Sequence, residues 1–179
     1  QADQVYVRTP LPDVRPTAAM KARVWIKQDK LSAAFGWVHQ RGLSVDDELN
    51  FLQEFEHITL ARVLIAQFKN NPLPGTLQEA LDLLERLLKA AEDGGRLRSM
   101  IEILILQALA NQLSGDNPRA QAHLEHALAL AEPQGFFQIF VDEGPPLAQL
   151  LYSISSSDEG SREVSTEYVQ RLLAAFPID

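Results

Sequence analysis

Residues 108–120 have the sequence ALANQLSGDNPRA, and they are followed at helical spacing by Leu124, Ala127 and Leu128. The first half continues an apolar helical pattern, and the run Ser-Gly-Asp-Asn ends it because these residues favour turns. Pro118 is a favoured first residue of a helix, and the pattern then extends to Glu132. The stretch therefore predicts two antiparallel helices joined by a short turn.

Much of this spacing recurs twice earlier in the chain, less well in the first unit, where Gln40 stands 11 residues after Asp29 in place of an apolar residue. A small residue and a large apolar residue lie 4 and 8 positions after Asp116, after Thr76 and after Asp29. These pairs are Ala120 and Leu124, Ala80 and Leu84, and Ala33 and Trp37. A small residue lets two antiparallel helices approach closely, and the large one fills the gap between neighbouring pairs. The sequence thus predicts three repeated helix pairs.

The unit at 108–128 resembles the tetratricopeptide repeat, although the spacings of 47 and 40 residues between the three alanines exceed that repeat's period of about 34. No set of strands is indicated. We predict an all-α fold of tetratricopeptide-like antiparallel helix pairs, stacked in a right-handed superhelix. The first helix of each pair would line its groove.

The domain organisation follows from the turn residues. Residues 1–16 hold three prolines and predict an extended lead-in, and residues 17–154 form the helical-repeat domain. Residues 155–165, rich in Ser, Asp, Glu and Gly, predict a flexible loop, and a C-terminal helix is expected within 166–179. Residues 135–146 are the one stretch with extended character.

Charge and composition exclude several function classes. The chain has 16 Lys and Arg against 24 Asp and Glu, a formal charge of −8, and no cysteine. A DNA-binding module needs a basic face, so we expect no direct nucleic-acid contact by this segment. The basic residues Arg86, Arg96 and Arg98 are interpreted as a solvated helix junction.

The most apolar run, residues 100–113, is interrupted by polar side chains and is too short to span a bilayer. No signal-peptide pattern opens the chain. We therefore expect a cytoplasmic location and no membrane contact.

Five segments carry a family resemblance. They are EFEHITLARVLIAQ (54–67), LLERLLKAAE (83–92), IEILILQALA (101–110), ALALAEPQGF (127–136) leading to FVDEGPP (140–146), and EYVQRLLAAF (167–176). In this order they resemble the helical middle region of the large ATP-binding LuxR-type transcriptional regulators, the MalT-like family. The resemblance covers about residues 17–176.

This resemblance implies a fragment of a larger regulator with an N-terminal P-loop ATPase and a C-terminal helix-turn-helix. The chain has no Gly-Lys-Ser/Thr sequence, so no cofactor is expected in this fragment and ATP only in the missing N-terminal domain. The DNA-binding domain would begin shortly after Phe176. The implied role of the middle region is to receive a small-molecule inducer or a regulatory protein and to control homo-oligomer formation.

Three residue clusters admit a chemical interpretation and a simpler one. Glu54 and His57 have the Glu-x-x-His spacing of di-iron bundles, but no second motif accompanies them, and a helix start with acidic residues near its positive end explains them better. His123 and His126 share a helix face, which we expect to be solvated. Asp142 and Glu143 would form a paired-carboxylate site or, more simply, an acidic cap on the helix beginning at residue 145 or 146. We predict no metal site and no enzyme activity.

The groove is the predicted ligand or partner site. Repeat alignment puts six side chains on it: Arg62, Gln67, Glu102, Ile105, Leu109 and Gln112. Two functions remain open, a signal-receiving domain of a regulator and a general tetratricopeptide-type scaffold that grips a partner peptide.

Overall fold

The computed structural model describes residues 16–156 and 164–176. Within these ranges the chain forms helices and no strand. The helices are α1 (Thr17–Lys27), α2 (Leu31–Arg41), η1 (Phe51–Gln53), α3 (Glu54–Asn70), α4 (Thr76–Asp93), α5 (Leu97–Ser114), α6 (Asn117–Ala131), η2 (Glu132–Gln134), α7 (Gln138–Val141), α8 (Pro145–Ser156) and α9 (Thr166–Ala175). None of the described helices is long and apolar enough to cross a membrane.

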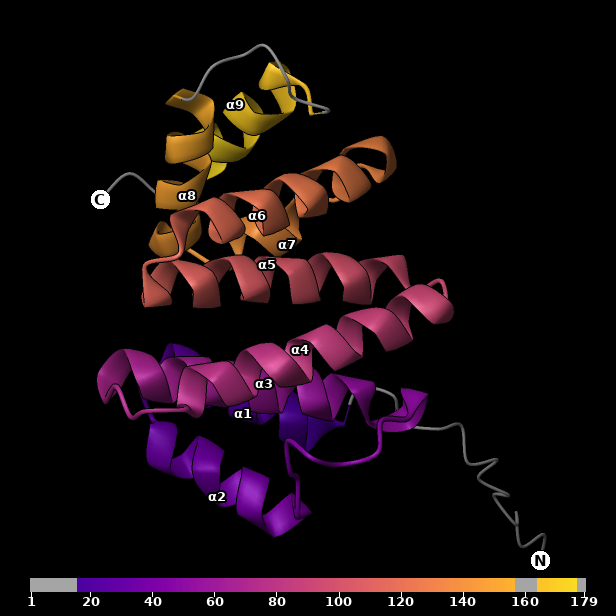
Figure 1. Ribbon diagram of the computed structural model, residues 1–179, viewed down its shortest axis with the longest axis vertical. Helices are drawn as coiled ribbons and strands as arrows, with labels where there is room; N and C mark the ends of the chain where they lie inside the picture. Colours follow the sequence, from indigo (N-terminus) through magenta and orange to yellow (C-terminus); the bar gives the residue numbers. More distant parts are fainter. Residues whose placement is uncertain (1–15, 157–163, 177–179) are drawn as a thin grey trace, which may run out of the picture.

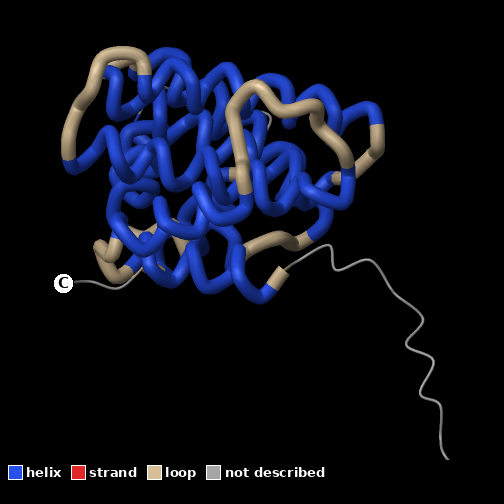
Figure 2. The backbone as a smooth tube through the Cα atoms, turned by 90° about the horizontal axis from the view of Figure 1, so that it is seen from below, coloured by secondary structure: helices blue, strands red, loops and turns tan. Residues whose placement is uncertain are grey.

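The helices stack in chain order along the long axis of the molecule (Figure 1). The turns α3–α4 and α5–α6 lie at one side of the stack and the turn α4–α5 at the other, so consecutive helices run antiparallel. Figure 2, seen from below along the stack, shows that the described residues are helices joined by loops. The predicted all-α fold of tetratricopeptide-like helix pairs is confirmed, and the right-handed superhelical twist stays a prediction.

The turn between α5 and α6 shows how residues 108–120 end one helix and begin the next. Gly115 takes a left-handed conformation with φ of 82° at the end of α5, which a side chain would disfavour. The Asp116 side chain then accepts a hydrogen bond from the backbone N–H of Arg119 at 3.2 Å and caps α6. Pro118 is the second residue of α6, one position later in the helix than predicted.

Helix α5 is packed from both directions and buries apolar side chains on two faces. Its Ile103 and Leu106 belong to a core formed with α1–α4. Its Ile101, Leu104 and Ile105 belong to a second core formed with α6–α9. The two cores therefore meet at α5, which joins the N-terminal and C-terminal halves of the stack.

Each of the three units buries one alanine completely at or next to the position predicted for its small residue. Ala80 and Ala120 are buried as predicted, but in the first unit the fully buried alanine is Ala34 and not Ala33. The large residue of the first unit, Trp37, is buried as predicted, so only the small residue of that unit differs.

Ala120→Leu tests this close approach of α5 and α6. We expect it to lower the free energy of unfolding by about 1–3 kcal/mol, because the added methylene groups have no space in the core. Urea denaturation followed by circular dichroism measures the change. Ala122→Leu is the matched control, since Ala122 is exposed on the same helix. Equal stability of the two variants would show that no close contact exists at Ala120.

Two predicted boundaries differ from the structure. Residues 138–141 form α7 and are not extended, because Ile139 and Phe140 turn together into the core. Ser155 and Ser156 belong to α8 and not to the predicted loop, whose residues 157–163 lie outside the described residues. Most of the predicted lead-in, residues 1–15, and the last residues of the chain, 177–179, also lie outside them.

Candidate binding groove

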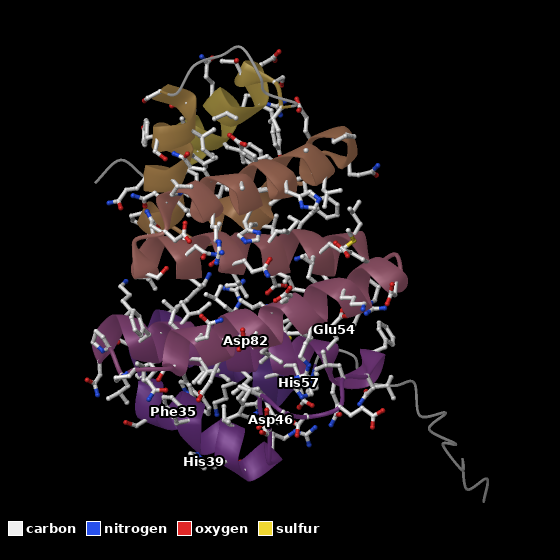
Figure 3. All side chains as sticks on the ribbon, viewed as in Figure 1. Phe35, His39, Asp46, Glu54, His57 and Asp82 are labelled. Atoms are coloured by element: carbon white, nitrogen blue, oxygen red, sulfur yellow. The ribbon has the colours of Figure 1, made fainter. Side chains whose placement is uncertain are left out.

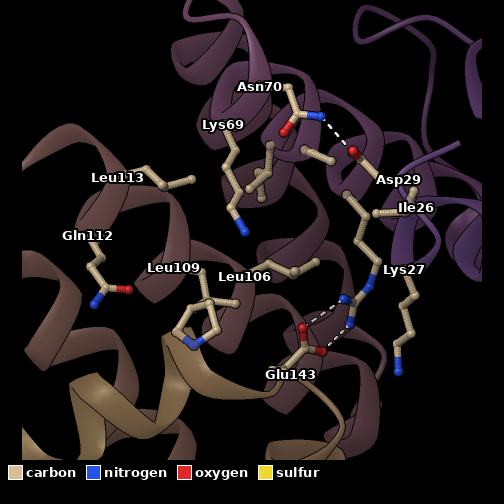
Figure 4. A pocket seen from close by; sticks show the side chains of 14 residues that line it. Ile26, Lys27, Asp29, Lys69, Asn70, Leu106, Leu109, Gln112, Leu113 and Glu143 are labelled. Atoms are coloured by element: carbon tan, nitrogen blue, oxygen red, sulfur yellow. Dashed lines mark hydrogen bonds and ion pairs between the residues drawn. The ribbon is translucent and has the colours of Figure 1, made fainter. Parts of the chain in front are cut away.

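The first helices of the three pairs, α1, α3 and α5, line a cavity together with the segment that leads into α8 (Figure 4). The groove cavity, as we name it, has a volume of about 410 Å³ and is lined by Ile26, Lys27, Asp29, Arg62, Ile65, Ala66, Lys69, Asn70, Leu106, Leu109, Gln112, Leu113, Glu143 and Pro146. A wider hollow of about 650 Å³ shares six of these residues and continues along α1 past Met20 and Val24.

Four charged side chains connect the elements that line these hollows, and we name them the groove network: Arg23, Arg62, Glu102 and Glu143. Arg62 of α3 donates two hydrogen bonds to the Glu143 carboxylate, at 2.6 and 3.0 Å. It also donates to Oε1 of Glu102 at 3.0 and 3.1 Å. Arg23 of α1 donates to the same Glu102 oxygen at 2.6 Å. The network thus links α1, α3, α5 and the start of α8.

The network is largely withdrawn from water, and the pairing within it favours the charged forms of Arg62 and Glu102. Burial lowers the pKa of Arg62, but Glu143 and Glu102 outweigh it and the net shift is upward. Burial likewise raises the pKa of Glu102, yet Arg62 and Arg23 bring it below its ordinary value. Burial, which outweighs the attraction of Glu102, lowers the pKa of Arg23 to about 10. These three groups are therefore ionised at neutral pH.

The rest of the groove cavity combines an apolar wall with two amines. Half of the lining is apolar, from Ile26 on α1 to Leu109 on α5. Lys27 and Lys69 are exposed and lie apart from each other among the lining residues in Figure 4. Asn70 donates a hydrogen bond to Asp29 at 2.7 Å across the end of α1 and α3. The cavity therefore offers an apolar surface with positive charge at its edge.

The structure brings together four of the six side chains predicted for the groove. Arg62, Leu109 and Gln112 line the groove cavity, and Glu102 lines the wider hollow and belongs to the groove network. Ile105 is fully buried in the core between α5 and α6, so its side chain is out of reach of a ligand. Gln67 is half-buried on α3 and lines neither hollow.

Sequence reasoning missed Arg23, Glu143, Lys27 and Lys69. Glu143 was interpreted as a helix cap, but its carboxylate pairs with Arg62, 81 residues earlier in the chain. Asp142 accepts a hydrogen bond from Gln138 at 2.7 Å, so the two carboxylates do not act as a pair. The sequence did contain one indication of a role for Arg23, namely the position of this arginine on the amphipathic first helix of the first pair.

The other chemical clusters have structural roles. Glu54 and His57 lie near the start of α3 (Figure 3). Glu54 accepts a hydrogen bond from Arg96 at 2.7 Å, and the buried His57 ring lies 3.1 Å from Asp47. Arg96 is thus an ion-pair partner and not part of a solvated junction. Across residues 16–156 and 164–176, no three His, Asp or Glu side chains are placed to share a metal ion.

The two histidines of α6 differ in exposure. His126 is exposed and His123 is half-buried. Burial is the main cause that lowers the pKa of His123, and the neighbouring His126 adds to it. His123 is therefore uncharged at neutral pH.

Residues 1–157 match the family model of the MalT-like TPR region, where TPR denotes the tetratricopeptide repeat. No curated protein and no solved structure matches the chain. Helix α9 lies beyond the matched residues, but it packs on the core that α5, α6, α7 and α8 form. The match spans most of the chain and agrees with the stacked helix pairs, and this protein therefore belongs to the family of MalT-like TPR regions.

Proposed function

We propose that this protein is the signal-receiving helical-repeat domain of a MalT-like, LuxR-type transcriptional regulator of the cytoplasm, and that its inducer or partner binds in the groove cavity. The observation that carries the proposal is the composition of the cavity wall, to which α1, α3, α5 and the start of α8 all contribute. A ligand at this point touches every repeat unit at once. It would stabilise one arrangement of the stack and so alter how the domain associates with other copies.

The groove supports binding rather than catalysis. Its arginines and buried carboxylates are engaged with one another, at 2.6–3.1 Å, and no member of the groove network is left to act as a general acid or base. What remains is an apolar surface with a few polar groups at its rim, which is typical of a small-molecule site.

A second function is a scaffold that grips a segment of a partner protein. The wider hollow favours it, because Met20 and Val24 on α1 are about half exposed at its edge, at 52% and 50%. An amphipathic partner helix buries such residues when it lies in a groove.

A thermal-shift screen of sugars, nucleotides and other metabolites tests the first function. We expect a specific ligand to raise the melting temperature of the 179-residue chain, because a compound that binds only the folded state stabilises it. Ala66→Trp is expected to abolish this shift, since Ala66 is half-buried on the cavity wall and an indole would fill the space.

Ala122→Trp is the matched control, with the same change at an exposed position of α6 away from the cavity. Its melting temperature should respond to the ligand as the unchanged protein does. A ligand that binds Ala66→Trp as tightly as Ala122→Trp would remove the groove cavity as the binding site. If no compound in the screen shifts the melting temperature, the scaffold function is favoured.

A further inference from the structure

We propose that the groove cavity binds a small organic carboxylate with an apolar body. This inference rests on the proposed function, because it names the chemical class of the compound that the cavity would receive. It comes from three properties of the lining: its apolar wall, its two amines that form no ion pair with a described residue, and its net charge.

The apolar wall sets the body of the ligand. Side chains from α1, α3, α5 and α8 contribute to it, namely Ile26, Ile65, Ala66, Leu106, Leu109, Leu113 and Pro146. A volume of about 410 Å³ lies within the range of about 300–1,000 Å³ found for small-molecule sites. A sugar or another fully polar compound would lose hydrogen bonds to water against this wall without replacing them. The wall therefore favours an apolar body.

The two lysines of the lining differ from its arginine. Arg62 is neutralised by Glu143 and Glu102 within the groove network. Lys27 and Lys69 make no ion pair with any described residue. Figure 4 shows them reaching the opening from α1 and α3. A carboxylate can pair with these amines without breaking any contact of the network.

The net charge of the lining indicates how many negative charges the ligand carries. The cations Lys27, Arg62 and Lys69 stand against the carboxylates Asp29 and Glu143, which leaves one positive charge. The whole chain, by contrast, has a formal charge of −8. A local surplus of one positive charge in an acidic protein is matched by a monoanion, and a carboxylate is the common organic monoanion at neutral pH.

Octanoate and 1-octanol test the inference, because they have the same apolar chain and differ in the charge of one end. Their dissociation constants are measured on the full chain by titration monitored in ¹H–¹⁵N NMR spectra. We expect octanoate to bind about fivefold more tightly than 1-octanol at low salt, which corresponds to one exposed ion pair. The preference should weaken as sodium chloride is raised, because salt screens exposed charges.

The variant Lys27→Gln/Lys69→Gln is expected to abolish the preference for octanoate and to leave 1-octanol binding unchanged. Lys21→Gln/Lys89→Gln is the matched control, because it removes the same charge from exposed lysines that do not line the cavity. It should keep the full preference. If both double variants lost the preference for octanoate over 1-octanol equally, the inference would be overturned, because the effect would then come from the total charge of the protein.

The other outcomes separate this inference from the proposed function. If octanoate and 1-octanol bind equally and Ala66→Trp blocks both, selection of a carboxylate is wrong and the groove cavity remains the binding site. The same conclusion follows if octanoate does not bind but an uncharged compound does, again in a manner that Ala66→Trp abolishes. If neither probe binds and Ala66→Trp affects no other ligand, both proposals fail.

Discussion

Phe140→Ala is expected to lower the free energy of unfolding by about 3–5 kcal/mol, the range found when a large buried aromatic side chain is removed. Phe140 lies on the short helix α7 and is fully buried. Its ring packs edge-on against that of Tyr168 on α9, with the centroids 6.4 Å apart and the planes at 90°. The side chain therefore joins α7 to α9 within the core that also includes α5 and α6.

The contacts around the Phe140 ring explain why a helix as short as α7 contributes to the stability of the fold. The Tyr168 hydroxyl donates a hydrogen bond to the backbone carbonyl of Phe136, just before α7. Burial, with a smaller contribution from Glu132, raises the pKa of Tyr168 to about 12. Glu132 in turn accepts hydrogen bonds from the backbone and side chain of Ser165 at the start of α9. Loss of the Phe140 ring leaves a cavity among these contacts.

Urea denaturation monitored by circular dichroism measures the effect of Phe140→Ala. Tyr152→Ala is the control, because Tyr152 is 58% exposed on α8 and its removal leaves no cavity. We expect the control to change the free energy of unfolding by less than about 0.5 kcal/mol. A similar value for Phe140→Ala would mean that α7 is not docked in the core.

The helix pairs could be predicted from the sequence because they depend on local signals. Gly115 and Asp116 end one helix and begin the next through their own backbone and side-chain hydrogen bonds, so a short segment contains all the information. Ala80 and Ala120 are buried where the repeat spacing placed them. In the first unit Trp37 is also buried as predicted, but two alanines stand side by side there, and the spacing indicated Ala33 where the structure buries Ala34.

The groove was predicted less well, and α5 shows why. A helix that buries apolar side chains on two faces has no single apolar stripe to indicate which face meets which neighbour. Ile105 was therefore assigned to the groove although it is fully buried against α6, whereas Leu109, one turn later, does line the cavity. Only the packing of α5 between its two neighbours decides between these residues.

The groove network could not be predicted because its contacts join distant parts of the chain. Arg23 and Glu102 are 79 residues apart, and Arg62 and Glu143 are 81 residues apart. Their contact depends on how far each helix pair is rotated against the next. Spacing within one helix contains no such information. The Glu143 side chain could equally have capped α8, and only the stacked structure excludes that alternative.

Arg62→Met is expected to lower the free energy of unfolding by about 3 kcal/mol, because it leaves carboxylates buried without their main cationic partner. Methionine keeps most of the length and apolar volume of the side chain, so the change removes the charge and little packing. Glu102 would retain Arg23, at 2.6 Å. Glu143, whose side chain is only 11% exposed, would lose its ion-pair partner among the described residues.

The control for this prediction is Arg119→Met. Arg119 forms an ion pair with Asp116 at 3.4 Å, but its side chain is 75% exposed. An exposed pair of this kind contributes about 0–1 kcal/mol, so the control should be nearly as stable as the unchanged protein. Equal losses for Arg62→Met and Arg119→Met would contradict a buried network across the groove.

The double variant Arg62→Met/Glu143→Gln separates the two causes that would weaken the fold. If Arg62→Met destabilises the protein because a buried carboxylate is left unpaired, neutralising Glu143 should restore about 1 kcal/mol or more. If the loss comes from packing alone, the second substitution restores nothing. The free energies of unfolding of the unchanged protein, Arg62→Met, Glu143→Gln and the double variant together form a double-mutant cycle. A coupling energy near zero would mean that Arg62 and Glu143 do not hold α3 to the start of α8.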